Sequence, residues 1–218
     1  MLRADLHVHT SFSHDGQATP EEIAARCERV GLSCVAVTDH DTIAGALETR
    51  GVARFRVIVG EEVNTRSGHV VGLFLSEEVP AGLSAIETMQ AIKEQGGLVL
   101  LPHAFDRFRS GLLHRISSET VLPLVDAVEV FNARTFLPQD NHLARSLADR
   151  HGLPATAGSD AHSVHELGRT YLEMPDFDGT PGGFLEALAK ATLMTRRANP
   201  LHRFVPSYVK LWRFLRHA

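Results

Sequence analysis

The sequence predicts a single α/β domain with a largely parallel sheet, because short apolar runs alternate with helix-period segments along its 218 residues. Each apolar run has the length of a buried strand rather than of a helix. After a first strand near residues 5–10, these runs cover residues 35–37, 57–59, 70–75, 98–101, 127–131, 155–157 and 171–172. Repeated strand–helix units of this kind are typical of a sheet covered by helices.

The segments between the strands carry helix start and stop signals. Residues 20–30 follow a capping residue, Thr19, begin with a proline and end at Gly31. Similar signals predict helices at residues 84–95, 139–151 and 180–190. Residues 63–70 instead have the pattern of a β-hairpin that turns at residues 66–68, so the third strand is expected to form one arm of a β-ribbon.

Composition limits the function classes. A net charge of −4 with both signs mixed gives no global case for nucleic-acid binding. Because no apolar run reaches about 18 residues and nothing at the start resembles a signal peptide, we expect a cytoplasmic protein without a membrane span. Cys27 and Cys34 are then expected to be reduced. Histidine is the outlier with 13 copies, which directs attention to metal ligation.

The first strand carries the first candidate metal ligands. It contains the segment Asp5-Leu6-His7-Val8-His9-Thr10. Residues two apart on a strand point to the same face, so His7 and His9 are predicted to project together from the strand end. Two converging imidazoles are a geometry that binds a metal ion.

Further His, Asp and Glu clusters follow the first strand. Most come directly after another predicted strand, and they are Asp15, Thr38-Asp39-His40-Asp41, Glu61-Glu62, His103 and Asp160-Ala161-His162. Barrels and open α/β sheets place their active sites at the carboxyl ends of strands. Each cluster alone has an ordinary structural explanation, but their recurrence at successive strand ends predicts one metal site.

The kinds of ligand restrict the metal. Imidazole nitrogen and carboxylate oxygen without cysteine suit Zn²⁺, Mn²⁺ or Fe²⁺ and argue against a structural thiolate zinc site. About eight candidate ligands are too many for one tetrahedral ion, so two to three divalent ions with bridging carboxylates are expected. Closely spaced ions suit the hydrolysis of phosphate esters by in-line attack.

The ordered motifs resemble those of the PHP (polymerase and histidinol phosphatase) superfamily. They are His7-Val8-His9, Thr38-Asp39-His40-Asp41, Gly60-Glu61-Glu62, Leu101-Pro102-His103 and Gly158-Ser159-Asp160-Ala161-His162. The match spans about residues 4–173. The resemblance implies a distorted seven-stranded (β/α)7 barrel, a trinuclear metal centre and metal-dependent phosphoesterase activity. We therefore expect a catalytic barrel with a β-hairpin extension over residues 1–195.

The resemblance also implies which residue holds which ion. The first ion takes His7, His9, Glu62 and Asp160, the second takes Asp15, His40 and His162, and Glu62 bridges to a third that His103 and His69 support. The residues themselves leave His69 open, because a histidine just after a hairpin turn has a structural explanation as well. Glu61 is the less suitable of the adjacent pair, since neighbours on a strand face opposite ways.

Carboxylates beside the ligands are candidates for a supporting role. Asp5 and Asp39 lie next to ligand histidines, where a carboxylate that holds the far ring N–H would fix the tautomer. Asp41 could do the same, could donate a proton near the centre, or could cap a helix over residues 42–47.

Three arginines are candidates for binding the substrate phosphate. Arg107, Arg109 and Arg134 lie in loops on the expected active face, and the guanidinium fork matches phosphate oxygens. The alternative for each is an ion pair with a neighbouring carboxylate. Asn132 could hydrogen-bond the substrate or cap the helix that follows it.

The end of the chain is basic. Residues 196–218 are expected to form an amphipathic helix or tail, either packed on the barrel or extending from it as a platform for nucleic acid or another anionic surface.

Taken together, the ligand motifs lead us to interpret the sequence as a phosphoesterase that uses a metal-activated hydroxide on a phosphorylated small molecule or nucleotide, with nucleic acid possible but not required. The alternatives are a 3′/5′ nuclease or nucleotide phosphodiesterase, and a non-catalytic metal-binding regulatory module.

Overall fold

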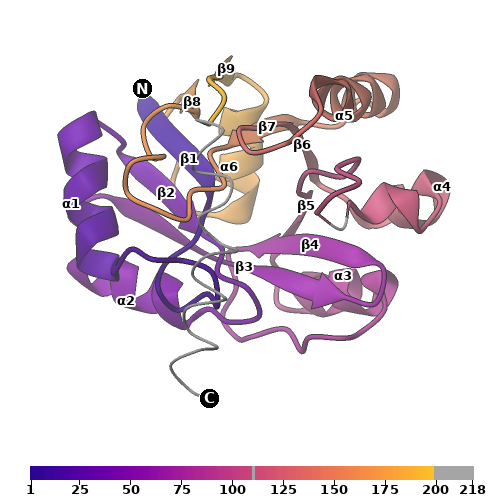
Figure 1. Ribbon diagram of the computed structural model, residues 1–218, viewed down its shortest axis with the longest axis horizontal. Helices are drawn as coiled ribbons and strands as arrows, with labels where there is room; N and C mark the ends of the chain where they lie inside the picture. Colours follow the sequence, from indigo (N-terminus) through magenta and orange to yellow (C-terminus); the bar gives the residue numbers. More distant parts are fainter. Residues whose placement is uncertain (110, 199–218) are drawn as a thin grey trace.

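In the computed structural model, which describes residues 1–109 and 111–198, the predicted alternation folds into one strongly curved sheet with helices around it (Figure 1). The strands are β1 (Leu2–Val8), β2 (Cys34–Val37), β3 (Arg56–Thr65), β4 (Gly68–Leu73), β5 (Leu98–Leu101), β6 (Ala127–Asn132), β7 (Ala155–Gly158), β8 (Tyr171–Met174) and β9 (Thr192–Met194). The α-helices are α1 (Pro20–Val30), α2 (Ala44–Val52), α3 (Ala85–Glu94), α4 (Ser118–Val121), α5 (Pro138–His151) and α6 (Pro181–Leu188). Short 3₁₀ turns lie at Leu112–His114 and Leu122–Leu124.

Strand pairing makes the sheet a nearly closed barrel. The strand order among the described residues is β7-β6-β5-β4-β3-β2-β1-β8-β9. Strands β1 to β3 are parallel to one another, as are β5 to β7. A parallel bridge between Val8 and Ala161 joins the end of β1 to the segment after β7, so the sheet curves round until its β7 edge meets β1, with β8 and β9 continuing beyond β1. The carboxyl ends of the parallel strands therefore surround one mouth.

The prediction of a seven-stranded (β/α)7 barrel is corrected to nine strands in the described part of the chain. The tight turn at Arg66 and Ser67 returns the chain alongside β3, and β4 then pairs antiparallel with both β3 and β5. The hairpin is therefore part of the sheet rather than an extension from it. The chain reverses again after α6, so that β9 pairs antiparallel with β8 and adds an outer strand.

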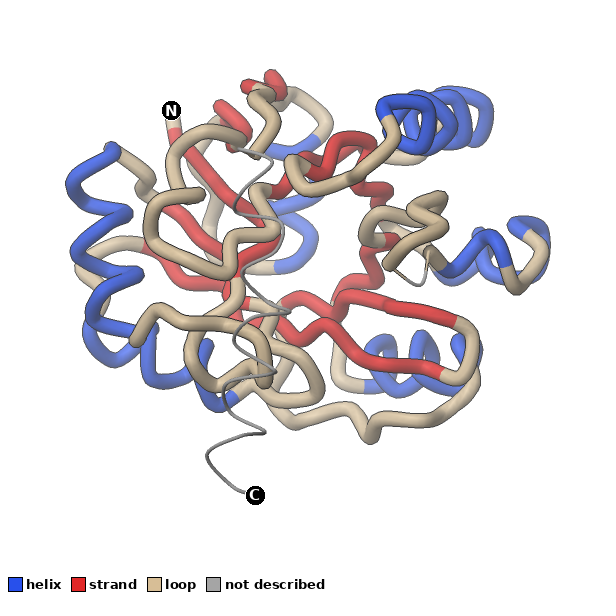
Figure 2. Tube along the Cα trace, viewed as in Figure 1, coloured by secondary structure: helices blue, strands red, loops and turns tan. Residues whose placement is uncertain are grey.

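The helix signals act as the sequence predicts. Thr19 caps α1 and forms a reciprocal capping box with Glu22, while Gly31 ends the helix with a left-handed φ of 76°. Ser84 and Glu87 form the same box at the start of α3. In Figure 2 helices α1 to α5, labelled in Figure 1, lie around the outside of the strands, whereas α6 lies behind them within the outline of the sheet.

The core has two parts that fix the sheet from both sides. One cluster of buried residues joins the sheet to α1, α3 and α5, with Ile23, Ile92 and Leu101 among its members. The other packs α6 against strand residues through Phe184 and Leu188.

Within the described ranges, no helix is both long and apolar enough to cross a membrane. The predicted basic helix falls almost entirely at residues 199–218, outside the described residues.

Candidate metal centre

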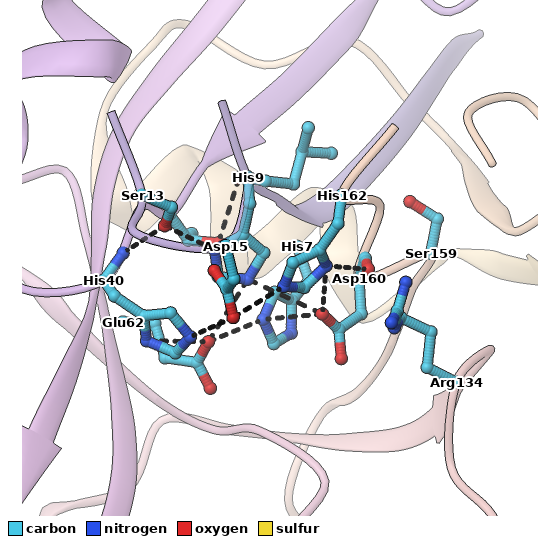
Figure 3. Close-up of polar contacts among 12 residues, drawn as sticks. His7, His9, Ser13, Asp15, His40, Glu62, Arg134, Ser159, Asp160 and His162 are labelled. Carbon is cyan, nitrogen blue, oxygen red and sulfur yellow. Dashed lines mark hydrogen bonds and ion pairs between the residues drawn. The ribbon is translucent and has the colours of Figure 1, made fainter. Parts of the chain in front are cut away.

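The nine predicted ligands converge at the mouth of the barrel. Figure 3 labels seven of them, all except His69 and His103. They form overlapping groups whose donor atoms lie within 4.8 Å of one another: His9, Asp15, His40 and His162; His7, Glu62 and His103; His7, His9 and Asp160; His40, Glu62 and His69. The groups overlap more than the predicted assignment, because His9 also lies with the second set and His40 with the third. Segments more than 150 residues apart in the chain thus supply one cluster.

Glu62 lies at the centre of the cluster. Its Oε2 atom lies 3.2 Å from His7 Nε2, 3.2 Å from His9 Nε2 and 3.6 Å from His40 Nδ1, while Oε1 lies 2.8 Å from His69 Nδ1 and 2.9 Å from His103 Nε2. Burial alone would raise the pKa of Glu62, but the surrounding imidazoles of His69, His7 and His40 hold that pKa well below its usual range. The carboxylate therefore stays charged, and each of its oxygens faces a different set of imidazoles.

Asp15 and His162 form the side of the cluster next to the loop after β1. Asp15 Oδ2 lies 3.4 Å from His162 Nε2 and 3.8 Å from His40 Nε2. Burial acts to raise the pKa of Asp15, but the hydrogen bond and charge of His162 and the nearby imidazoles lower it overall. Burial lowers the pKa of His40 to about 3, so this imidazole is neutral, as a metal ligand must be.

The donor atoms fit divalent metal ions. Among the described residues, the ring nitrogens His9 Nε2, His40 Nδ1 and His103 Nδ1 are buried without a hydrogen bond. Buried polar groups are otherwise nearly always hydrogen-bonded. Imidazole nitrogens together with ionised carboxylates, and no thiolate in the cluster, match the preferences of Zn²⁺, Mn²⁺ and Fe²⁺.

The backbone is strained where it presents ligands. Asp160 has a φ of 52° and His103 a φ of 26°, and Asp41 beside His40 has a φ of 57°. A positive φ is unfavourable for residues with a side chain and often marks a functional site. The surrounding structure therefore holds the backbone at these residues in a conformation that the free chain would rarely adopt.

The carboxylates expected to orient the ligand rings contact other groups. Asp5 Oδ1 accepts hydrogen bonds from the backbone amides of His7 and Ser159, at 3.5 and 3.0 Å. Asp39 accepts from the amide and hydroxyl of Thr10, at 2.6 and 2.7 Å. Both therefore fix the backbone of the ligand-bearing loops, which corrects the prediction that they hold far ring nitrogens.

The prediction that Asp41 caps a helix is wrong. Its carboxylate accepts hydrogen bonds from the backbone and side-chain amides of Asn64, at 2.8 and 2.6 Å. Helix α2 begins only at Ala44, and Ile43 at its N-cap makes no side-chain cap. Asp41 therefore ties the loop after β2 to the hairpin rather than capping a helix.

Glu129 of β6 orients His7, a role that the sequence interpretation missed. Its Oε1 lies 3.1 Å from His7 Nδ1, and its Oε2 accepts from the His103 amide at 2.8 Å and from Asn132 Nδ2 at 2.9 Å. A carboxylate on the far ring nitrogen fixes the tautomer of a metal ligand. The sequence did carry one signal for this role, because Glu129 is the one acidic residue in the otherwise largely apolar strand β6. The close approach needs Gly158, where a Cβ would lie 2.4 Å from Glu129 Oε1.

Replacing Glu129 by glutamine is expected to weaken metal binding about 10- to 100-fold, the usual cost of losing such a partner. The amide keeps the size of the side chain but brings an N–H group either against the donors of both His103 and Asn132 or against His7 Nδ1. Titration of the metal-free protein with Mn²⁺ measures the change. An unchanged affinity would show that Glu129 does not orient His7.

The predicted phosphate-binding arginines have different surroundings. Arg109 forms an ion pair with Asp160 and donates to Asn132 Oδ1 at 2.9 Å. Burial would raise the pKa of Asp160, but Arg109 and the nearby imidazoles hold it well below its usual range. Arg134 is buried in an ion pair with Glu166 at 2.7 Å, whereas the side chain of Arg107 is 54% exposed.

Asn132 connects the loops that follow β5 and β6. Its side-chain oxygen accepts from Arg109 and from the backbone amide of Arg134, and its Nδ2 donates to Asp160 Oδ2 at 3.0 Å. Of the four predicted substrate residues, Asn132 and Arg109 therefore border the metal cluster directly. Arg134 supports the loop, and Arg107 lies at the rim.

Comparison with known proteins gives family matches over most of the chain. A family model described as PHP domain matches residues 5–152, and one described as PHP-associated matches residues 138–193. An uncharacterized protein of Methanocaldococcus jannaschii is 33% identical over 212 residues, covering 92% of this chain and 85% of the relative. A 5'-3' exoribonuclease of Haemophilus influenzae is 31% identical over 117 residues, covering 47% of this chain and 42% of that protein.

A solved structure has the same fold. It is a two-domain protein from Bacteroides vulgatus that contains a predicted PHP-like metal-dependent phosphoesterase, and it superposes with a TM-score of 0.71 at 20% identity. The superposition covers 88% of this chain but only 64% of the Bacteroides protein. At this identity the likeness concerns the fold alone.

Proposed function

Because the chain belongs to the PHP family, we propose that it is a metal-dependent phosphoesterase that hydrolyses a phosphate ester of a small molecule or nucleotide. The observation that carries the proposal is Glu62, whose two carboxylate oxygens face different groups of imidazoles. A shared carboxylate in this position suits metal ions held close together. Such pairs stabilise both the attacking and the leaving oxygen of an in-line displacement at phosphorus.

In this proposal the nine clustered residues hold two to three divalent ions of zinc, manganese or iron. When bound, the ions would activate the attacking water and offset charge on the phosphate oxygens. Glu129, Asp5 and Asp39 keep the ligand-bearing strand ends in place. Arg109, with its side chain 28% exposed beside Asp160, can reach a phosphate oxygen at the mouth.

Two alternatives remain as outcomes of the test. A nuclease or nucleotide phosphodiesterase is favoured by the similarity to the Haemophilus influenzae exoribonuclease. A non-catalytic metal-binding module is disfavoured because the chain retains every ligand expected for an active centre. We further propose that residues 1–195 form the catalytic unit, since the mouth of the barrel draws on strands from β1 to β7.

A hydrolysis screen tests the proposal. The full chain loaded with Mn²⁺ or Zn²⁺ is offered a phosphomonoester, a phosphodiester, histidinol phosphate, nucleotides and short oligonucleotides. We expect release of phosphate or of a nucleotide from at least one class. Hydrolysis of oligonucleotides alone would favour the nuclease. A metal-loaded protein that hydrolyses none of them would contradict the proposal and favour the non-catalytic module.

A further inference from the structure

We propose that a cavity on the outer wall of the barrel, between α5 and β9, binds a small organic phosphate. The inference goes beyond the proposed function, because none of the residues that line this cavity belongs to the metal cluster. The cavity has a volume of about 550 Å³, within the usual range of pockets for small molecules. Two arginines line it, Arg145 of α5 and Arg197 in the segment after β9.

The positive charge of this outer cavity is not neutralised by the residues that the structure describes. Over residues 1–109 and 111–198, neither Arg145 nor Arg197 forms an ion pair or a hydrogen bond, and the same holds for His142 beside them. Asp149, one helical turn beyond Arg145, forms no ion pair with it. No Asp or Glu of the described residues lines the cavity, and none occurs in the sequence after Glu186. The two guanidinium groups therefore lack an anion.

Strand β6 separates the outer cavity from the metal centre. Val130 and Phe131 line the cavity, whereas the side chains of Glu129 and Asn132 contact the metal cluster. Strict alternation along a strand would not place residues three positions apart on one face. The pairing of β6 with β7 shifts register between Glu129 and Phe131, as at a β-bulge, and this shift explains the arrangement. An anion in the cavity would therefore lie on the opposite face of β6 from the metal cluster.

The two arginines match the charge and shape of a phosphate monoester. Such a group carries a charge of about −1.5 to −2 at neutral pH, so it can neutralise both guanidinium groups, whereas a carboxylate can neutralise only one. The planar fork of arginine also donates parallel hydrogen bonds to phosphate oxygens. Thr195, which is exposed and lines the same cavity, offers a hydroxyl donor. Phosphate is therefore the anion that this donor set fits best.

The remaining lining favours a phosphate that carries an organic group. Phe131, Leu193 and Pro138 line the cavity next to the arginines, and each of the three keeps part of its surface exposed. Covering this apolar surface with an aromatic or aliphatic group is favourable, because it removes apolar area from water. Inorganic phosphate would leave that surface uncovered. We therefore expect an organic phosphate to bind more tightly than the inorganic ion.

The test titrates the full chain, loaded with Zn²⁺, with phenylphosphonate, whose carbon–phosphorus bond a phosphoesterase does not hydrolyse. The methyl NMR signals of Leu193 and Thr195 report on the outer cavity. We expect both signals to shift and to saturate, with weaker binding for inorganic phosphate and for benzoate. Arg145→Gln and Arg197→Gln should each weaken binding about ten- to a hundredfold, the usual effect of losing a hydrogen bond between charged groups.

Arg150→Gln is the matched control, because Arg150 lies on the same helix but donates to the Ser146 carbonyl and does not line the cavity. It is expected to leave the affinity unchanged. Thr195→Glu adds a carboxylate at an exposed position of the cavity wall and should abolish the shift of the Leu193 signal. Equal weakening by Arg145→Gln and Arg150→Gln would indicate a general charge effect and overturn the inference, as would benzoate binding as tightly as phenylphosphonate.

The same titration after dialysis against EDTA separates this inference from the proposed function. Binding in the cavity should persist, since no proposed metal ligand lines it. Signals of Leu193 and Thr195 that shift only in the metal-loaded protein, or in neither form, would overturn the inference. A protein that binds phenylphosphonate here but hydrolyses none of the screened esters would support the cavity and contradict only the proposed function.

Discussion

Replacing Glu62 by glutamine is expected to lower hydrolysis about a thousandfold, because losing the shared carboxylate forfeits several kcal/mol of charge stabilisation and each 1.36 kcal/mol is a factor of ten in rate. The amide is neutral and presents one oxygen instead of two. The five imidazoles that surround the native carboxylate would then face a donor N–H group on one side. The measurement is kcat/KM on whichever substrate the hydrolysis screen identifies.

Glu61 provides a matched control for this variant. It has the same side chain, precedes Glu62 on β3 and turns away from the metal centre, where its Oε2 accepts from the Val79 amide at 2.9 Å. Burial raises the pKa of Glu61 to about 7, so a neutral amide is a close replacement for its acid form. We expect Glu61→Gln to keep activity within a few-fold of the wild type. Equal effects of the two substitutions would contradict the role given to Glu62.

Removing the metal ions is expected to destabilise the fold substantially. Each site that binds its ion only in the folded state contributes about 4 kcal/mol when the ion is present at a thousand times its dissociation constant. For a domain of this size each kcal/mol shifts Tm by roughly 2–4 °C, so chelation should lower Tm by on the order of 10 °C for each ion removed. The physical reason is that buried imidazole nitrogens such as His103 Nδ1 lose their partner.

Thermal unfolding followed by circular dichroism checks this expectation. The full chain is compared before and after dialysis against EDTA, and again after Mn²⁺ is restored, which should recover the higher Tm. Glu62→Gln should show a smaller difference between the two states than the wild type. An identical Tm with and without metal would mean that the cluster forms no metal site in the folded protein.

Most strands and the longer helices could be predicted from the sequence because local signals agree with the final packing. The apolar run at residues 98–101, for example, coincides with β5. Strand β9 escaped prediction because it has three residues, exposed at both ends, and lies on the outside of β8. Helix α2 was only considered as far as residue 47, because it lacks a side-chain N-cap and contains two glycines.

The convergence of the ligands could be predicted because it depends on a rule of strand direction. Parallel strands end at one edge, so His40 after β2 and His162 after β7 meet even though 122 positions separate them. The supporting carboxylates depend instead on distances across the barrel. Nothing near Glu129 in the sequence indicates that His7 lies 3.1 Å from it, and nothing near Arg134 indicates its ion pair with Glu166.

Elemental analysis of the purified protein tests the central claim most directly. After loading with Mn²⁺ or Zn²⁺ and removal of excess metal, the wild type is expected to retain at least two transition-metal ions per chain, and His40→Ala fewer. The grouping of nine donors around Glu62 predicts this result. A wild-type chain that retains no metal after loading would contradict the multinuclear centre and the phosphoesterase function built on it.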